Sequence, residues 1–241
     1  MATPTATAMN PEARLRLYQL LSPALPVGAF SYAEGLEPLV QRGALPDAAA
    51  VAAWLTAELQ GGALRLEAAA LPRLMRLLEA WQRQAADGQE AEAAALRREL
   101  ERRDGDLLAL REARELRAQQ RQMGGSLLQL LSDLGWPLPT PVALAWPGAF
   151  AWAGVCLGIP ELELIEAYLY GWSANQLSAA VRLVPLGPTE AQRQQLALAP
   201  LISQQAALLL ACDPDALWSA GVGAGLAQLQ QAELYSRLFR S

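Results

Sequence analysis

The sequence predicts an all-α protein, a single-domain helical bundle of roughly ten helices. The chain of 241 residues is rich in Ala, Leu, Glu, Gln and Arg, which are strong helix formers, and poor in β-branched residues. Apolar residues recur at helical spacing between glycine and proline breaks, with no alternation of strand and helix patterns. Residues 1–10 are small and polar, so we expect a disordered segment there, followed by one all-α domain over residues 11–241.

The first two predicted helices flank a proline-rich loop. One covers residues 12–21, with Pro11 in its first turn. Its apolar face carries Leu15, Tyr18 and Leu21. The second begins at Ser31-Tyr32-Ala33-Glu34, a capping-box pattern in which hydroxyl and carboxylate each satisfy a free backbone donor. Pro38 should kink or shorten that helix, and Gly43 ends it.

The middle of the chain is predicted to alternate long helices with glycine breaks. One helix runs from Asp47 to Gln60, and a longer one covers residues 64–86 after a glycine pair. The polar stretch 89–103 is either a solvated helix or a mobile connection. Helices over 106–122 and 126–134 are expected on either side of a second glycine pair. The long helix carries an apolar stripe typical of a core, at Leu74, Met75, Leu78 and Trp81.

Residues 134–160 carry no charge, and a stretch of that length could span a bilayer. Several prolines interrupt it, and the nearest charges, Asp133 and Glu161, are both acidic, so it has no positive-inside signal. We therefore favour a buried core helix over about 147–157. The remaining predicted helices cover 161–184, 189–211 with a bend at Pro200, and a last one opened by Asp213-Pro214 that contains Gly221, Gly223 and Gly225.

The composition excludes several kinds of active site. With neither histidine nor lysine, the chain cannot build a Ser-His-Asp or Cys-His site, an imidazole metal site, a P-loop or a Schiff base. Cys156 and Cys212 lie far apart in apolar surroundings and are interpreted as small core residues, with a disulfide or a soft-metal pair as the alternative. A net charge of −5 argues against nonspecific nucleic-acid binding. A cytosolic, reducing compartment is expected.

The chain ends on Arg237-Leu238-Phe239-Arg240-Ser241, an aromatic and a leucine between two permanent cations. Chain termini usually carry small polar residues, so this composition indicates a segment that docks on another surface. The alternative is an ordinary helix C-terminus, where arginine complements the macrodipole and bonds the last carbonyls.

Four segments, taken in order along the chain, carry a resemblance to a known family. They are 20–37, 114–117 with 122–124, 168–175 with 182–187 and 192–193, and 235–241. Each match alone is weak, but an ordered set that reaches the last residue is strong. The set resembles the UreF-type urease accessory proteins.

The resemblance implies an all-α accessory protein that is not an enzyme and that forms a homodimer. It implies a UreD/UreH-type accessory protein, a UreG-type GTPase and apo-urease as partners, with no nucleic acid and no membrane. Nickel is implied only as transferred cargo, with no stably bound cofactor, and the location as cytoplasmic. A generic helical adaptor unrelated to urease is the alternative function. An enzyme using Glu161, Glu163 and Glu166 is disfavoured because that spacing scatters the carboxylates around a helix.

Within the family the C-terminal tail is a partner-docking element, and the loop around Pro26-Val27-Gly28 lies at the partner-facing surface. We therefore predict no catalytic or metal-binding residue. The predicted partner-binding residues are Tyr32, Glu34, Glu37, Arg114, Arg117, Tyr235, Arg237, Leu238, Phe239, Arg240 and Ser241. The alternative readings are that Glu34 only completes the capping box, that Tyr32 only packs, and that the charges on residues 114–117 form a solvated helix face.

Overall fold

A computed structural model describes residues 9–241, and over that range the chain forms ten α-helices, three short 3-10 helices and no strand. The predicted all-α class is confirmed. The disorder predicted for residues 1–10 falls mostly on residues 1–8, which lie outside the described range. The α-helices are α1 Pro11–Leu20, α2 Leu36–Gln41, α3 Ala48–Gly61, α4 Leu64–Ala86, α5 Glu90–Ala109, α6 Arg114–Asp133, α7 Trp146–Leu157, α8 Glu161–Leu183, α9 Pro188–Leu210 and α10 Val222–Gln230; the 3-10 helices are η1 Ala29–Ser31, η2 Pro214–Ala216 and η3 Gln231–Glu233.

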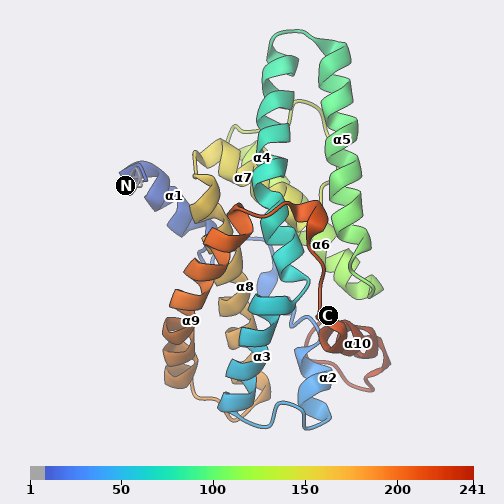
Figure 1. The fold of residues 1–241 in the computed structure, drawn as a ribbon. Coiled ribbons are helices and arrows are strands. Elements are labelled where there is room, and N and C mark those ends of the chain that lie inside the picture. The colour runs from blue at the N-terminus through green and yellow to red at the C-terminus, as the bar shows by residue number, and fades with distance from the viewer. Residues whose placement is uncertain (1–8) are drawn as a thin grey trace.

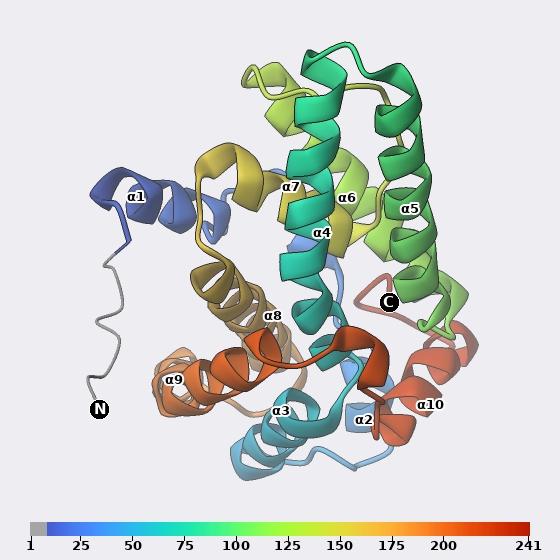
Figure 2. The same cartoon turned by 45° about the horizontal axis from the view of Figure 1, so that its top comes forward.

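The long helix α4 runs through the centre of the molecule and packs against α5, α7, α8 and α9 (Figure 1). With α5 it forms a helical hairpin whose tip projects from one end, while α8 and α9 form a second hairpin (Figures 1 and 2). At the end opposite the projecting tip, α10 packs on α2, and the chain terminus lies beside both. The first and last thirds of the chain therefore meet at one place.

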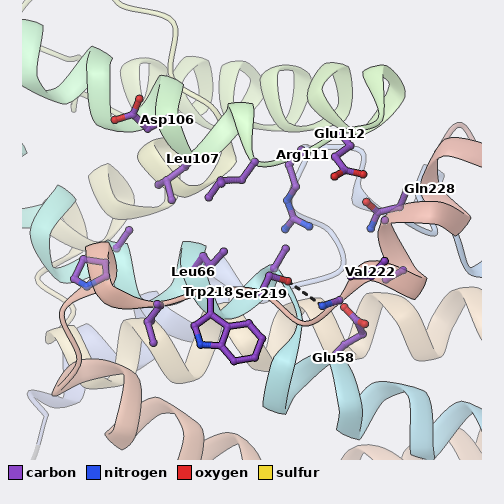
Figure 3. Close-up of a pocket in the computed structure, with 18 of the residues that line it drawn as sticks. Glu58, Leu66, Asp106, Leu107, Arg111, Glu112, Trp218, Ser219, Val222 and Gln228 are labelled. Carbon is purple, nitrogen blue, oxygen red and sulfur yellow. Dashed lines mark hydrogen bonds between the residues drawn. The ribbon is translucent and has the colours of Figure 1, made fainter.

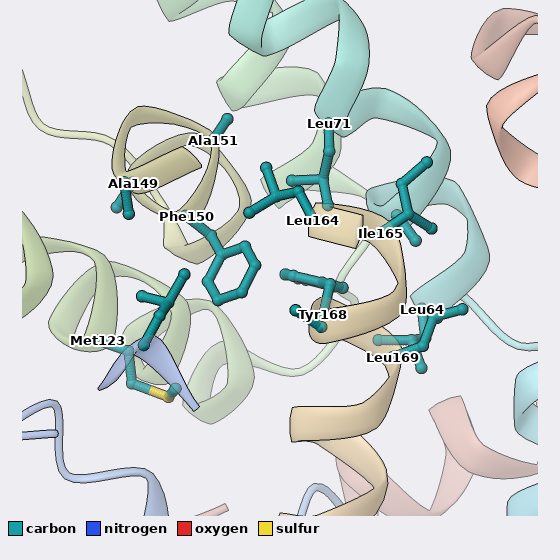
Figure 4. Close-up of a cluster of buried hydrophobic side chains, with 14 of the residues drawn as sticks. Leu64, Leu71, Met123, Ala149, Phe150, Ala151, Leu164, Ile165, Tyr168 and Leu169 are labelled. Carbon is teal, nitrogen blue, oxygen red and sulfur yellow. The ribbon is translucent and has the colours of Figure 1, made fainter. Parts of the chain in front are cut away.

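The uncharged stretch folds as the buried helix α7, as predicted. Its Phe150 ring meets Tyr168 of α8 edge-on at 5.2 Å between centroids, within the apolar cluster of Figure 4. Gly154 lets α8 approach, because a Cβ there would lie 2.5 Å from Leu164 Cδ2. No helix among residues 9–241 combines the length and apolarity that crossing a membrane requires. Cys156 and Cys212 are both free and half-buried.

Two predicted helix breaks are wrong. The helix α5 continues through Asp104-Gly105, and α6 continues through Gly124-Gly125. Asp104 is buried, and the Ala145 N–H donates to both oxygens of its carboxylate, at 2.9 and 3.0 Å. A Cβ on Gly124 would collide with the backbone carbonyl of Leu144. These residues bring two helices against the loop before α7, and the actual break falls at residues 110–113.

Two further expectations at the ends of the chain are corrected. The apolar face predicted for α1 is largely solvent-exposed, with Leu15 at 65% and Tyr18 at 58%, because this projecting helix contacts the body through the adjacent stripe Ala13, Leu17 and Leu20. The last helix does not open at Asp213-Pro214. The Asp213 carboxylate accepts the Asp215 N–H and caps only η2, while α10 starts eight residues later.

Candidate functional site

The C-terminal tail, residues 235–241, is an irregular segment that folds back onto the loop before α2 (Figure 1). The helix-terminus reading is therefore wrong. Backbone hydrogen bonds fasten the tail: Arg240 N donates to Ser31 O at 2.9 Å, and Ala33 N donates to Ser241 O at 2.9 Å. Two irregular segments of the chain are thus joined by backbone hydrogen bonds at this point without forming regular secondary structure.

The side chain of Glu37 is the principal clamp on this tail. Its Oε1 accepts the Leu238 N–H at 2.8 Å and its Oε2 accepts the Phe239 N–H at 3.1 Å. The carboxylate is buried, and Gln231 Nε2 also donates to it, at 3.3 Å. The chain reaches this place through Gly35, where φ is +86° and a Cβ would lie 2.8 Å from Gln228 N of α10. Glycine is required there because both the conformation and the space exclude a side chain.

Phe239 is the apolar anchor of the tail. Its ring is buried, and the guanidinium of Arg182 on α8 lies 4.7 Å from the ring centroid, within cation–π range. Gln231 Nε2 donates to the Phe239 carbonyl at 3.2 Å. Burial of a phenylalanine side chain stabilises by about 1.5–3 kcal/mol, so this residue contributes a large share of the docking energy.

The capping box predicted at residues 31–34 does not form. Glu34 has φ +50°, the only positive value for a non-glycine residue in the described range, and its side chain turns inward. Gln119 Nε2 of α6 donates to it at 2.8 Å, and Trp172 Nε1 of α8 donates at 3.0 Å. These buried donors outcompete the local cap, so α2 begins only at Leu36. Burial raises the pKa of Glu34, and the charge of Arg111 opposes that rise.

The last residue is linked to this buried cluster. Ser241 Oγ donates to Gln119 Oε1, and Gln119 in turn donates to Glu34. Tyr32 is also buried, and its backbone carbonyl accepts from Asn175 Nδ2 of α8 at 3.1 Å. The tail end, the loop before α2, α6 and α8 therefore share one hydrogen-bonded network.

The remaining predicted residues face solvent or lie apart from the clamp. Tyr235, Arg237, Leu238 and Arg240 are exposed, Tyr235 completely. Arg114 is exposed at the start of α6, and the half-buried Arg117 donates through Nη1 to the carbonyls of residues 111 and 112, at 2.5 and 2.7 Å. Neither arginine makes a hydrogen bond to the tail within residues 9–241. Arg117 instead holds the turn between α5 and α6.

Sequence reasoning missed the buried ion pair beside this network. Arg111 Nε donates to Glu67 Oε1 at 2.6 Å, and Tyr168 OH donates to Glu67 Oε2 at 2.8 Å. The signal for Glu67 was a lone carboxylate among the apolar residues that open α4. Glu67 lines a cavity of about 240 Å³ beneath the proline-rich loop, whereas Arg111 lines a cavity of about 760 Å³ on the other side (Figure 3). Each member of the pair therefore lines one of the two cavities.

The described residues hold no group of three or more His, Cys, Asp or Glu side chains placed to bind a metal ion. The fold and this site define an all-helical protein whose C-terminal segment is clamped onto the loop before α2.

Comparison with known proteins agrees with this class. The family model for UreF matches residues 45–199. Proteins described as urease accessory protein UreF are similar over nearly the whole chain: that of Alkalilimnicola ehrlichii is 39% identical over 98% of this chain and 100% of its own length, that of Synechocystis sp. 38% over 97% and 100%, and that of Azoarcus sp. 41% over 94% and 95%. The chain belongs to the UreF family of urease accessory proteins, which are not enzymes.

Proposed function

We propose that this protein is a dimeric scaffold for urease maturation. It bridges a UreD/UreH-type accessory protein and a UreG-type GTPase, and the assembly delivers nickel to apo-urease in the cytoplasm. The observation that carries the proposal is the two-sided tail: Phe239 and Ser241 face the protein, while Leu238 and Arg240 face solvent. Family membership supplies the urease context.

The clamp gives the tail the properties of a binding surface. Because hydrogen bonds to its peptide groups hold residues 238–241, the backbone that carries the exposed side chains is fixed before a partner arrives, which lowers the entropic cost of binding. Arginine, leucine and tyrosine then offer a planar cation and apolar area, and arginine and tyrosine are enriched in interface hot spots. Loss of Arg240 is expected to weaken partner binding by about 2 kcal/mol.

Nickel enters this proposal as cargo of the assembly. The chain lacks histidine, and carboxylate, carbonyl and water ligands hold nickel weakly. Such ligands suit passage better than storage. The protein's own contribution is to hold its partners in the geometry in which the metal is handed on.

Co-expression with a UreD/UreH-type protein and a UreG-type GTPase, followed by pull-down and size-exclusion chromatography with light scattering, tests the proposal. We expect a stoichiometric complex that contains two copies of this chain. Arg240→Ala and Leu238→Ala should weaken it. The matched controls Arg98→Ala on α5 and Leu196→Ala on α9 also remove exposed side chains and should not. A folded chain that binds neither partner would favour the generic adaptor.

A further inference from the structure

The cavity of about 760 Å³ lies between α4, the end of α5, α10 and the segment that joins α9 to α10 (Figure 3). We name that segment, residues 214–221, the strap. The cavity walls are mostly apolar and include Leu66, Leu107, Trp218 and Val222. Its volume falls within the range of about 300–1,000 Å³ that is typical of small-molecule sites.

The strap is fastened at both ends. Near its start, Asp215 pairs with Arg73 at 2.8 Å and with Arg103 at 2.6 Å. Near its end, Ala220 N donates to Gly61 O at 2.8 Å. The rim of the cavity is therefore preformed, and both rim arginines are already engaged by carboxylates, because Arg103 also pairs with Glu99 at 2.9 Å.

Arg111 places a further guanidinium in the same cavity, one that is buried and is not bound to the strap. It is only 5% exposed, and its guanidinium points into the cavity (Figure 3). Its Nε is bonded to Glu67, but neither Nη nitrogen has a hydrogen-bond partner anywhere in residues 9–241. Both Nη nitrogens are accessible from the cavity and are not sealed inside the protein. Donors of a charged group this deeply placed call for an acceptor.

We propose that this cavity binds a monoanionic organic carboxylate, with its two oxygens on the two Nη nitrogens of Arg111 and its apolar body against Leu107 and Trp218. The planar fork of an arginine matches a carboxylate in bidentate geometry. Because Asp215 engages Arg73 and Arg103, and Glu67 engages only Nε of Arg111, the two Nη nitrogens of Arg111 are the donors left for the ligand. Two donors on one guanidinium and apolar walls fit a carboxylate with an apolar body better than inorganic phosphate.

Glu58 of α3 lines the same cavity and makes binding depend on pH. The charged groups that face it are Arg111, from the turn after α5, and Glu34, from the loop before α2. Burial raises the pKa of Glu58 to about 7, with Arg111 opposing and Glu34 adding to the rise. Below that pH Glu58 is neutral and leaves Arg111 to the ligand. Above it, a second carboxylate competes for the same guanidinium.

Isothermal titration calorimetry on the full chain tests the proposal, with hexanoate and benzoate as probes. The neutral amides hexanamide and benzamide and inorganic phosphate are the comparisons. We expect saturable one-site binding of the carboxylates that is at least about tenfold tighter than that of the amides, since a charged hydrogen bond is worth about 1.5–3 kcal/mol. Binding should weaken between pH 6 and pH 8, and Glu58→Gln should remove that dependence.

Variants locate the site. The double variant Glu67→Gln/Arg111→Gln removes the buried pair without stranding a charge and should weaken carboxylate binding at least about tenfold. Leu107→Trp fills the cavity, leaves Arg111 in place and should have the same effect if the double variant does not fold. Arg98→Gln is the exposed control and should bind as the parent does. The proposal is overturned if the carboxylates do not saturate, if amide or phosphate binds equally well, or if Leu107→Trp still binds.

Discussion

Substitution of Glu37 by glutamine should release the tail while leaving the helices intact. The carboxylate accepts two backbone N–H groups and one amide N–H, but a glutamine in its place can present only one oxygen. Its amide group would face a donor at the other position. At least one charge-assisted hydrogen bond, worth about 1.5–3 kcal/mol, is therefore lost from a buried site.

A loss of about 2 kcal/mol corresponds to roughly 30-fold more frequent opening, since each 1.4 kcal/mol is a factor of ten. Hydrogen exchange followed by mass spectrometry should show this increase in peptides that span residues 234–241, while circular dichroism stays unchanged. Glu233→Gln, an exposed carboxylate close to the tail in sequence, is the matched control. Unchanged exchange in the Glu37 variant would show that Phe239 and the backbone pairing hold the tail without the clamp.

Three further outcomes are expected. Deletion of residues 237–241 should abolish partner binding in the pull-down with helix content unchanged; normal assembly of the truncated chain would contradict the docking role. Glu58→Gln should raise the free energy of unfolding, measured by urea titration, by about 1–3 kcal/mol above pH 7 and leave it unchanged below about pH 4.5. The reason is that folding raises the pKa of this carboxyl from 4.5 to about 7, so the wild-type side chain lowers stability as the pH rises through that range. Gly124→Ala should destabilise by about 1–3 kcal/mol through collision with the Leu144 carbonyl, whereas Gly125→Ala, with nothing within 4 Å, should stabilise by about 0.5–1 kcal/mol; equal melting temperatures would refute the packing argument.

Much of the helical framework is predictable from local pattern. The boundaries of α4 fall where the sequence places them, between a glycine pair and Asp87-Gly88, and the carboxylate of Asp47 caps α3 through the Ala50 N–H at 2.9 Å. The same logic fails at Gly124, because glycine there serves a close contact and not a break. Local sequence does not distinguish these two uses of glycine, since the difference lies in a neighbour that is distant along the chain.

The site is less accessible to local reasoning than the fold. The residues at 31–34 match the capping-box pattern, but the Glu34 carboxylate accepts hydrogen bonds from donors 85 and 138 residues away instead. The resemblance pointed to the tail, yet which of its side chains face inward is decided by Glu37, about two hundred positions earlier. Arg111 and Glu67 gave no periodic signal because a single buried pair has no period.

Glu37 binds the peptide groups of the tail and not the side chains of the tail, and this has a consequence for how the tail can change. Leu238 and Arg240 can be exchanged for almost any residue without loss of these hydrogen bonds, provided that neither becomes proline, which lacks the N–H that each of them donates. The outward surface can thus diverge to fit a different partner while the inward anchor stays constant. The same set of backbone hydrogen bonds can therefore hold tails with many different outward-facing side chains.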